Sequence, residues 1–91
     1  MKIKEEYLLQ NIADKWIVID TNGKSVNFNK ILSLNDSGKF LWERLEAGAE
    51  ADELVSGLMA RFGIDQALAR RDVETFIGKL QELECIEHEE N

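Results

Sequence analysis

The chain has 91 residues and a formal net charge of −7, from 18 acidic and 11 basic side chains. This length suits one small domain, whose thin core leaves little room for an elaborate internal active site. The basic residues are scattered, whereas nucleic-acid binders gather Lys and Arg on one face. No apolar run approaches the roughly 20 residues that span a bilayer. We therefore expect neither a nucleic acid nor a membrane as partner.

The first strands are predicted from residues 7–20. Tyr7–Ala13 is the first candidate, and Asp14-Lys15 supplies a polar turn after it. Trp16–Asp20 is β-branched and aromatic, and it is apolar on both faces. That composition is typical of a central strand, because such a strand is covered on both sides. Residues 1–6 are polar, and we expect the ends of the domain, about 1–5 and 88–91, to be disordered.

A third strand is predicted at Ser25–Asn29. Val26 and Phe28 would face one way, and Ser25, Asn27 and Asn29 the other, which is the pattern of a half-buried strand. Asn22-Gly23 before it is a strong hairpin signal, since both residues tolerate positive φ. The three strands form an antiparallel meander, and Ile31 and Leu32 are expected to enter the core as the chain crosses to the first helix.

Three helices are predicted after the strands. The first begins within Leu34–Leu45, where Asn35, Asp36 and Ser37 are all good N-cap types. The second is Ala51–Phe62, ended by Gly63, and the third runs from an Asp65 N-cap to about Glu84. Strands followed by helices indicate an α+β fold with a winged-helix-like arrangement, a single domain over residues 1–91.

The sequence offers no catalytic constellation. Cys85 is the one cysteine, so an internal disulfide is excluded and a reducing cytoplasmic location is favoured. Acidic neighbours disfavour its thiolate, and we expect a small core hydrophobe. His88 lies among glutamates near the C-terminus, without a positioned partner for general-base work. One Cys and one His do not make a zinc site. We expect no enzyme, no metal and no cofactor.

The predicted third strand lies at an open edge of the sheet. Its unpaired backbone groups invite another strand. In one interpretation Lys24, Lys30 and the shortness of the strand protect this edge. In the other, a peptide docks there as a fourth strand. Two further functions stay open: a winged-helix DNA-binding or transcription-associated module, and a dimerisation module paired through the edge.

Several blocks of the chain resemble a known family. NIADKWIVIDTNGKSVNFNKILSLNDSGKFLWERL, then ELVSGLMARFGID and DVETFIGKLQEL, are similar to the PqqD-like family (coenzyme PQQ synthesis protein D and relatives) over roughly residues 11–87. The resemblance implies a non-enzymatic recognition element for ribosomally made precursor peptides. It would bind the leader segment and deliver it to a modifying enzyme, often a radical S-adenosylmethionine enzyme, as in pyrroloquinoline quinone biosynthesis. We expect a monomer or weak dimer.

The resemblance implies that the leader adds to Ser25–Asn29 and lies against helix 66–84. At about 100° per residue, that helix has one flank with Ile77 and an opposite flank with Leu68, Asp72, Thr75 and Lys79. Ile77 and the adjacent Gly78, which would let a backbone approach, favour the first flank, although Ile77 could be plain core and Gly78 a helix defect of about 1 kcal/mol. The predicted peptide-binding residues are Ser25, Val26, Asn27, Phe28, Asn29, Arg70, Glu74, Ile77, Gly78 and Gln81.

Overall fold

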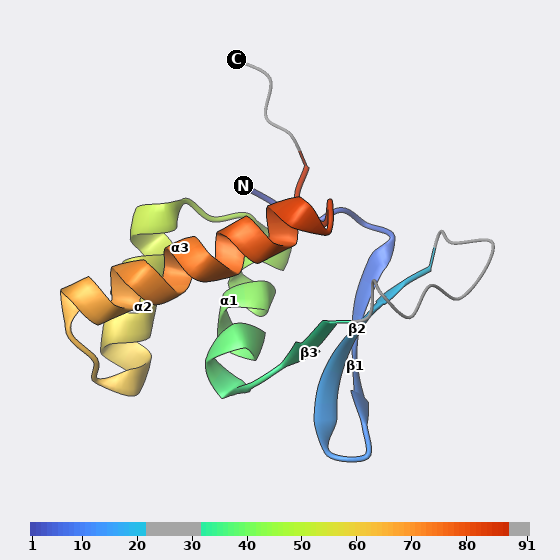
Figure 1. Ribbon diagram of the computed structural model, residues 1–91, viewed down its shortest axis with the longest axis horizontal. Helices are drawn as coiled ribbons and strands as arrows, with labels where there is room; N and C mark the ends of the chain where they lie inside the picture. The colour runs from blue at the N-terminus through green and yellow to red at the C-terminus, as the bar shows by residue number, and fades with distance from the viewer. Residues whose placement is uncertain (22–31, 88–91) are drawn as a thin grey trace.

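The computed structural model describes residues 1–21 and 32–87. Three antiparallel strands are followed by three helices, which confirms the predicted α+β fold (Figure 1). The sheet has the order β1-β2-β3, so the predicted central position of the second strand is also confirmed. The elements are β1 (Tyr7–Ile12), β2 (Lys15–Asp20), β3 (Leu32–Leu34), α1 (Asp36–Ala47), α2 (Ala51–Phe62) and α3 (Gln66–Glu82).

A tight two-residue loop joins β1 to β2. Ile12 lies opposite Lys15 in the register, which leaves Ala13 and Asp14 as the loop. Their φ angles are 51° and 64°. Two-residue hairpin loops of the primed type require positive φ at both positions, because that backbone matches the twist of the strands. The sequence signal was weak here, since neither loop residue is glycine or asparagine.

The third strand of the described residues is β3, which the sequence analysis treated as a connection. Val18 lies opposite Leu32, and Trp16 lies opposite Leu34. Leu32 and Leu34 are buried while Ser33 is exposed. Three residues are too few for a periodic signal, and the N-cap of α1 follows at once. The predicted strand Ser25–Asn29 and the Asn22-Gly23 turn lie outside the described residues.

Side-chain caps fix where the helices begin. Asn35 Oδ1 accepts a hydrogen bond from the Gly38 amide at 2.8 Å, and Asp65 Oδ1 accepts one from the Leu68 amide at 2.8 Å. At α2, Glu50 and Glu53 form a reciprocal capping box. Such caps satisfy amides that the first helical turn leaves without a partner. Gly63 ends α2 at φ 67°, in the left-handed region that glycine favours.

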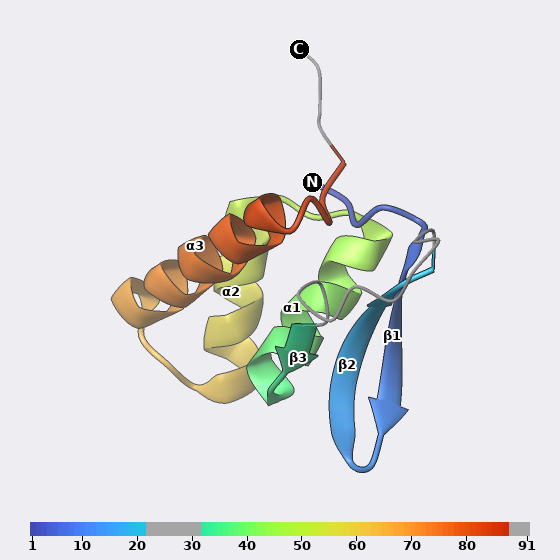
Figure 2. The same cartoon turned by 45° about the vertical axis from the view of Figure 1, so that its right-hand side comes forward.

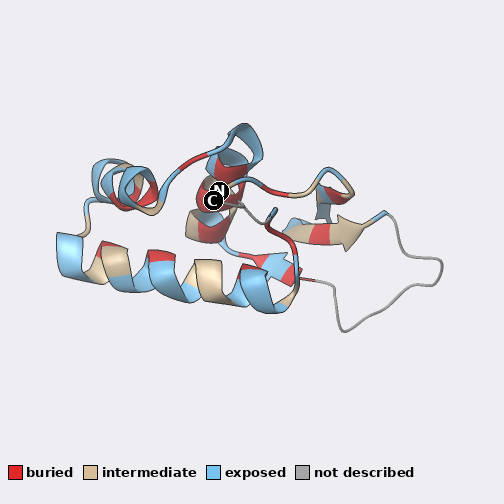
Figure 3. Cartoon of the chain, turned by 90° about the horizontal axis from the view of Figure 1, so that it is seen from above, coloured by how far each residue is buried: buried red, intermediate tan, exposed pale blue. Residues whose placement is uncertain are grey.

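One core joins the sheet to the helices. Figure 3 shows α1 near the centre, with many buried positions, and α3 with its outer side exposed. Cys85 is buried in this core, as expected for a small hydrophobe. The largest fully buried side chains are Trp42, Leu45, Leu54, Leu58, Leu80, Val18 and Val73.

The N-terminal residues are tied to the core, which corrects the expectation that residues 1–5 are disordered. Ile3 is buried, and its amide donates to the Leu45 carbonyl at 3.1 Å. The Lys4 amide donates to the Cys85 carbonyl at 2.9 Å, and Ile3 pairs with Ile86 in an isolated antiparallel bridge. In Figure 1 the N-terminus accordingly lies beside the end of α3. These partners are distant in sequence, so the polar composition of residues 1–6 did not reveal them.

Candidate functional site

A pocket of about 590 Å³ lies between β3 and α3. Its floor comes from β3 and the first turns of α1, and its outer wall comes from α3. Apolar side chains make up part of the floor, and polar and charged side chains stand around it. The lining residues are Lys15, Leu32, Ser33, Leu34, Asn35, Ser37, Gly38, Leu41, Asp72, Thr75, Phe76 and Lys79.

One side of this pocket is the edge of the sheet. β2 pairs with one side of β3, and within residues 1–21 and 32–87 no strand pairs with the other side. Backbone N–H and C=O groups on such an edge are open to a further strand. Because Leu32 and Leu34 face the core, a strand added here would direct alternate side chains toward α3. The pocket is therefore placed to receive every second residue of an extended peptide.

Gly38 at the start of α1 lets the floor of the pocket stay close to the sheet. A Cβ atom at this position would lie 3.2 Å from Asn35 Oδ1 and 3.4 Å from Leu34 Cβ. The first distance is tight, and Asn35 Oδ1 is held in place by the Gly38 amide. Glycine thus suits the join between β3 and α1.

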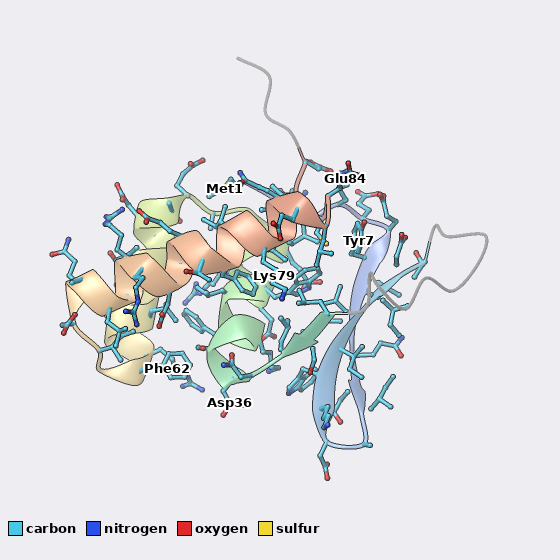
Figure 4. All side chains as sticks on the ribbon, viewed as in Figure 1. Met1, Tyr7, Asp36, Phe62, Lys79 and Glu84 are labelled. Atoms are coloured by element: carbon cyan, nitrogen blue, oxygen red, sulfur yellow. The ribbon has the colours of Figure 1, made fainter. Side chains whose placement is uncertain are left out.

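One stripe of α3 forms the outer wall of the pocket. Asp72, Thr75, Phe76 and Lys79 follow one another at helical spacing and all line it. Phe76 is partly buried against the core, whereas the other three are exposed. Figure 4 shows Lys79 on the side of α3 that faces α1 and β3. This stripe belongs to the flank that the sequence analysis did not favour.

The favoured flank lies away from the described pocket. Arg70 Nη2 is 3.0 Å from Asp52 Oδ1 on α2, so this side of α3 turns toward α2 rather than β3. Ile77 is partly buried and packs against the core. Glu74 and Gln81 are exposed, and none of the five predicted α3 residues, Gly78 included, lines the pocket. Contacts of the leader with the favoured flank therefore stay a prediction, while Ile77 shows that an apolar residue on a flank can serve the core as readily as a groove.

The charges around the pocket differ in sign from the protein as a whole. Among the described residues that line it, Lys15 and Lys79 are cationic and Asp72 is anionic. Neither lysine forms an ion pair with any residue that the structure describes. In a chain of net charge −7, these two free ammonium groups stand out as a local excess of positive charge.

A further feature of the described residues is the placement of the side chains that can bind metal ions. Within the described residues there is no group of three or more His, Cys, Asp or Glu side chains placed to hold a metal ion. In the same part of the chain, no helix has the length and apolar character that crossing a membrane demands. The pocket offers a shaped surface beside an open strand edge, which is suited to binding an extended segment.

A family comparison agrees with this geometry. The model of the family described as coenzyme PQQ synthesis protein D (PqqD) matches residues 15–86. This chain belongs to the PqqD family. The matched range runs from the start of β2 past the end of α3, so it contains every element that lines the pocket. The family membership predicted from the sequence blocks is confirmed. A comparison of this PqqD-family chain with curated proteins gave no match.

Two solved structures share the fold of this PqqD-family chain. TbiB1 in complex with the TbiA(beta) leader peptide superposes with a TM-score of 0.77 at 23% identity, over 100% of both chains. Lasso peptide synthetase B1 complexed with the leader peptide superposes with a TM-score of 0.69 at 17% identity, over 89% of both chains. At these identities the likeness shows a common fold.

Proposed function

We propose that this PqqD-family chain binds the leader segment of a ribosomally synthesised precursor peptide. The observation that carries the proposal is the pocket of about 590 Å³ between the open edge of β3 and α3. In strand addition, main-chain hydrogen bonds to the edge supply affinity and register. Side-chain pockets beside the edge then supply specificity, and Leu34, Leu41 and Phe76 form the apolar part of such a pocket here.

The similar structures support the same occupant. Both TbiB1 and lasso peptide synthetase B1 are complexed with a leader peptide, and both share the order of strands and helices seen here. The PqqD family match covers the same elements. A leader segment is therefore the ligand class that this chain's fold, family and pocket all favour.

The proposal includes a second protein as partner. The domain would present the bound precursor to a modifying enzyme, and the family resemblance favours a radical S-adenosylmethionine enzyme. Only Lys30 and Ile31 separate the predicted residues Ser25–Asn29 from β3 in sequence, so we retain them as candidates for the paired edge. On α3 we place the contact at Thr75, Phe76 and Lys79, which line the pocket.

An NMR titration tests this function. The ¹⁵N-labelled protein is titrated with a synthetic leader from a candidate precursor peptide, and with a scrambled version of that leader as control. We expect the leader to cause saturable amide shifts at Leu32–Leu34 and along α3 between Asp72 and Lys79. The scrambled peptide should cause none of these shifts. Shifts confined to α2, or equal shifts with the scrambled peptide, would overturn the proposed site.

The same sample separates the two remaining functions. Binding to random duplex DNA that weakens steeply with salt would favour a DNA-binding module instead. A stable dimer in sedimentation, with the leader unable to bind, would favour a dimerisation module paired through β3. We expect neither, because an acidic surface disfavours duplex DNA and the pocket beside β3 is shaped for side chains.

A further inference from the structure

The pocket has two ends that differ in charge. β3 and α3 run in roughly opposite directions, as both Figure 1 and Figure 2 show. Leu32 at the start of β3 therefore lies toward the C-terminal half of α3, where Lys79 stands. The Leu34 end lies toward Asp72. Lys15 precedes Trp16, which pairs with Leu34, so Lys15 also belongs to the Asp72 end.

The charges are balanced at one end of the pocket and unbalanced at the other. At the Leu34 end, the carboxylate of Asp72 and the ammonium of Lys15 both line the pocket and offset each other in sign. At the Leu32 end, Lys79 is the charged lining residue, and it has no ion-pair partner among the described residues. As far as the described residues line the pocket, an extended peptide would thus meet a net positive charge at the Leu32 end and balanced charges at the Leu34 end.

Building on the proposed function, we propose that the bound leader carries a large apolar residue against Phe76 and an acidic residue that pairs with Lys79. Both residues would point toward α3, because alternate side chains of an added strand share a face. The acidic residue would be two positions from the apolar one, on the side nearer Leu32. The opposite end, where Asp72 and Lys15 offset each other, would not attract it, so the charge pattern also favours one register.

The spacing of the two elements is compatible with this arrangement. Phe76 and Lys79 are three residues apart, which is about 4.5 Å along a helix axis. Two residues of an extended strand advance about 6.6 Å. The long, exposed side chain of Lys79 spans the difference of about 2 Å. Phe76 is held by the core, so it sets the position of the apolar residue, and Lys79 adapts.

A selection experiment tests the charge pattern without a known ligand. A phage-displayed library of random 12-residue peptides is selected against the wild-type protein and against Lys79→Glu. The control is Arg71→Glu, which makes the same change of charge at an exposed position of α3 outside the pocket. We expect wild type and Arg71→Glu to enrich Asp or Glu two positions from a large apolar residue, and Lys79→Glu to enrich Lys or Arg there.

Affinities of one selected peptide complete the test. An exposed pair is weak, so we expect Lys79→Glu to bind it about fivefold less tightly and Arg71→Glu within about twofold. Changing the acidic residue of the peptide to Lys should restore binding to Lys79→Glu. Peptides that shift the amides of Leu32–Leu34 but show no acidic preference would overturn this inference alone. Selected peptides that leave those amides unchanged would overturn the proposed function as well.

Discussion

The Cys85 amide donates to the Leu80 carbonyl at 2.9 Å, a bond that reaches back over the end of α3. The Glu84 amide donates to the Gln81 carbonyl at 3.1 Å alongside it. Together these bonds make a Schellman ending, which satisfies two carbonyls of the last turn. The ending turns the chain back over the core, so that Ile86 reaches Ile3. Figure 4 shows the result, with Tyr7 and Glu84 at the same corner of the molecule.

This ending places Glu84 in a conformation that suits glycine better. Its φ is 60°, and an L-residue there costs about 1–2 kcal/mol, part of which the flexibility of glycine in the unfolded chain offsets. We expect Glu84→Gly to raise the free energy of unfolding by about 0.5–1 kcal/mol, measured by urea denaturation. Glu74→Gly, in the interior of α3, should lower it by about 1 kcal/mol. Equal destabilisation by both variants would contradict this account of the ending.

The sequence predicts those helix ends that are determined by residues within one turn. Helix α2 lies between Glu50 and Gly63, as predicted. Acidic residues in its first turn and a glycine in the left-handed conformation at its end each affect the helix only over the adjacent turn. The features that the sequence did not predict depend on contacts between segments that are distant in sequence. Ile3 is buried by Leu45 and Ile86, and β3 is recognisable as a strand only through its pairing with β2.

The candidate site shows the same division. Helical spacing gave the two flanks of α3, yet the choice between them depends on where the helix docks. The ion pair between Arg70 and Asp52 marks the flank that lies toward α2, and Thr75 lines the pocket beside β3 on the other flank. No spacing within α3 carries that information. The charge of Lys79 was visible in the sequence, but its position beside β3 was not.

Because of Tyr7, the free energy of unfolding should depend on pH in the alkaline range. Burial raises its pKa to about 12, and the nearby Cys85, Asp20 and Glu6 act in the same direction. In the unfolded chain the pKa returns to about 10, so the folded state holds the phenol proton more tightly. This stabilisation is fully present below pH 10 and is lost as the pH rises toward 12, by up to about 2 kcal/mol.

Two measurements check this dependence. Tyr7 is the single tyrosine of the chain, so tyrosinate absorbance at 295 nm reports on it alone. We expect a midpoint near 12 for the folded protein. In Tyr7→Phe, the fall in unfolding free energy between pH 10 and 12 should become smaller. A native midpoint at the ordinary value of about 10 would refute the proposed burial effect.

A substitution at Gly78 distinguishes which flank of α3 binds the leader, if both stability and leader affinity are measured. A Cβ atom at Gly78 would meet no atom within 4 Å. Because glycine disfavours a helix interior, we expect Gly78→Ala to raise the free energy of unfolding by about 1 kcal/mol. Leader affinity should stay within about twofold of wild type, since Gly78 lies outside the pocket. A stabilised variant that binds the leader much more weakly would instead indicate that the leader contacts the Ile77 flank.

The central claim is that the leader binds between β3 and the Thr75 flank of α3, and a pair of tryptophan variants tests it most directly. Thr75 lines the pocket, whereas Glu74 is exposed on the other flank. Thr75→Trp should fill the pocket and weaken leader binding roughly tenfold or more, while Glu74→Trp should change it less than about twofold, as measured by fluorescence anisotropy. Full affinity in a folded Thr75→Trp, with binding lost in Glu74→Trp, would contradict the claim.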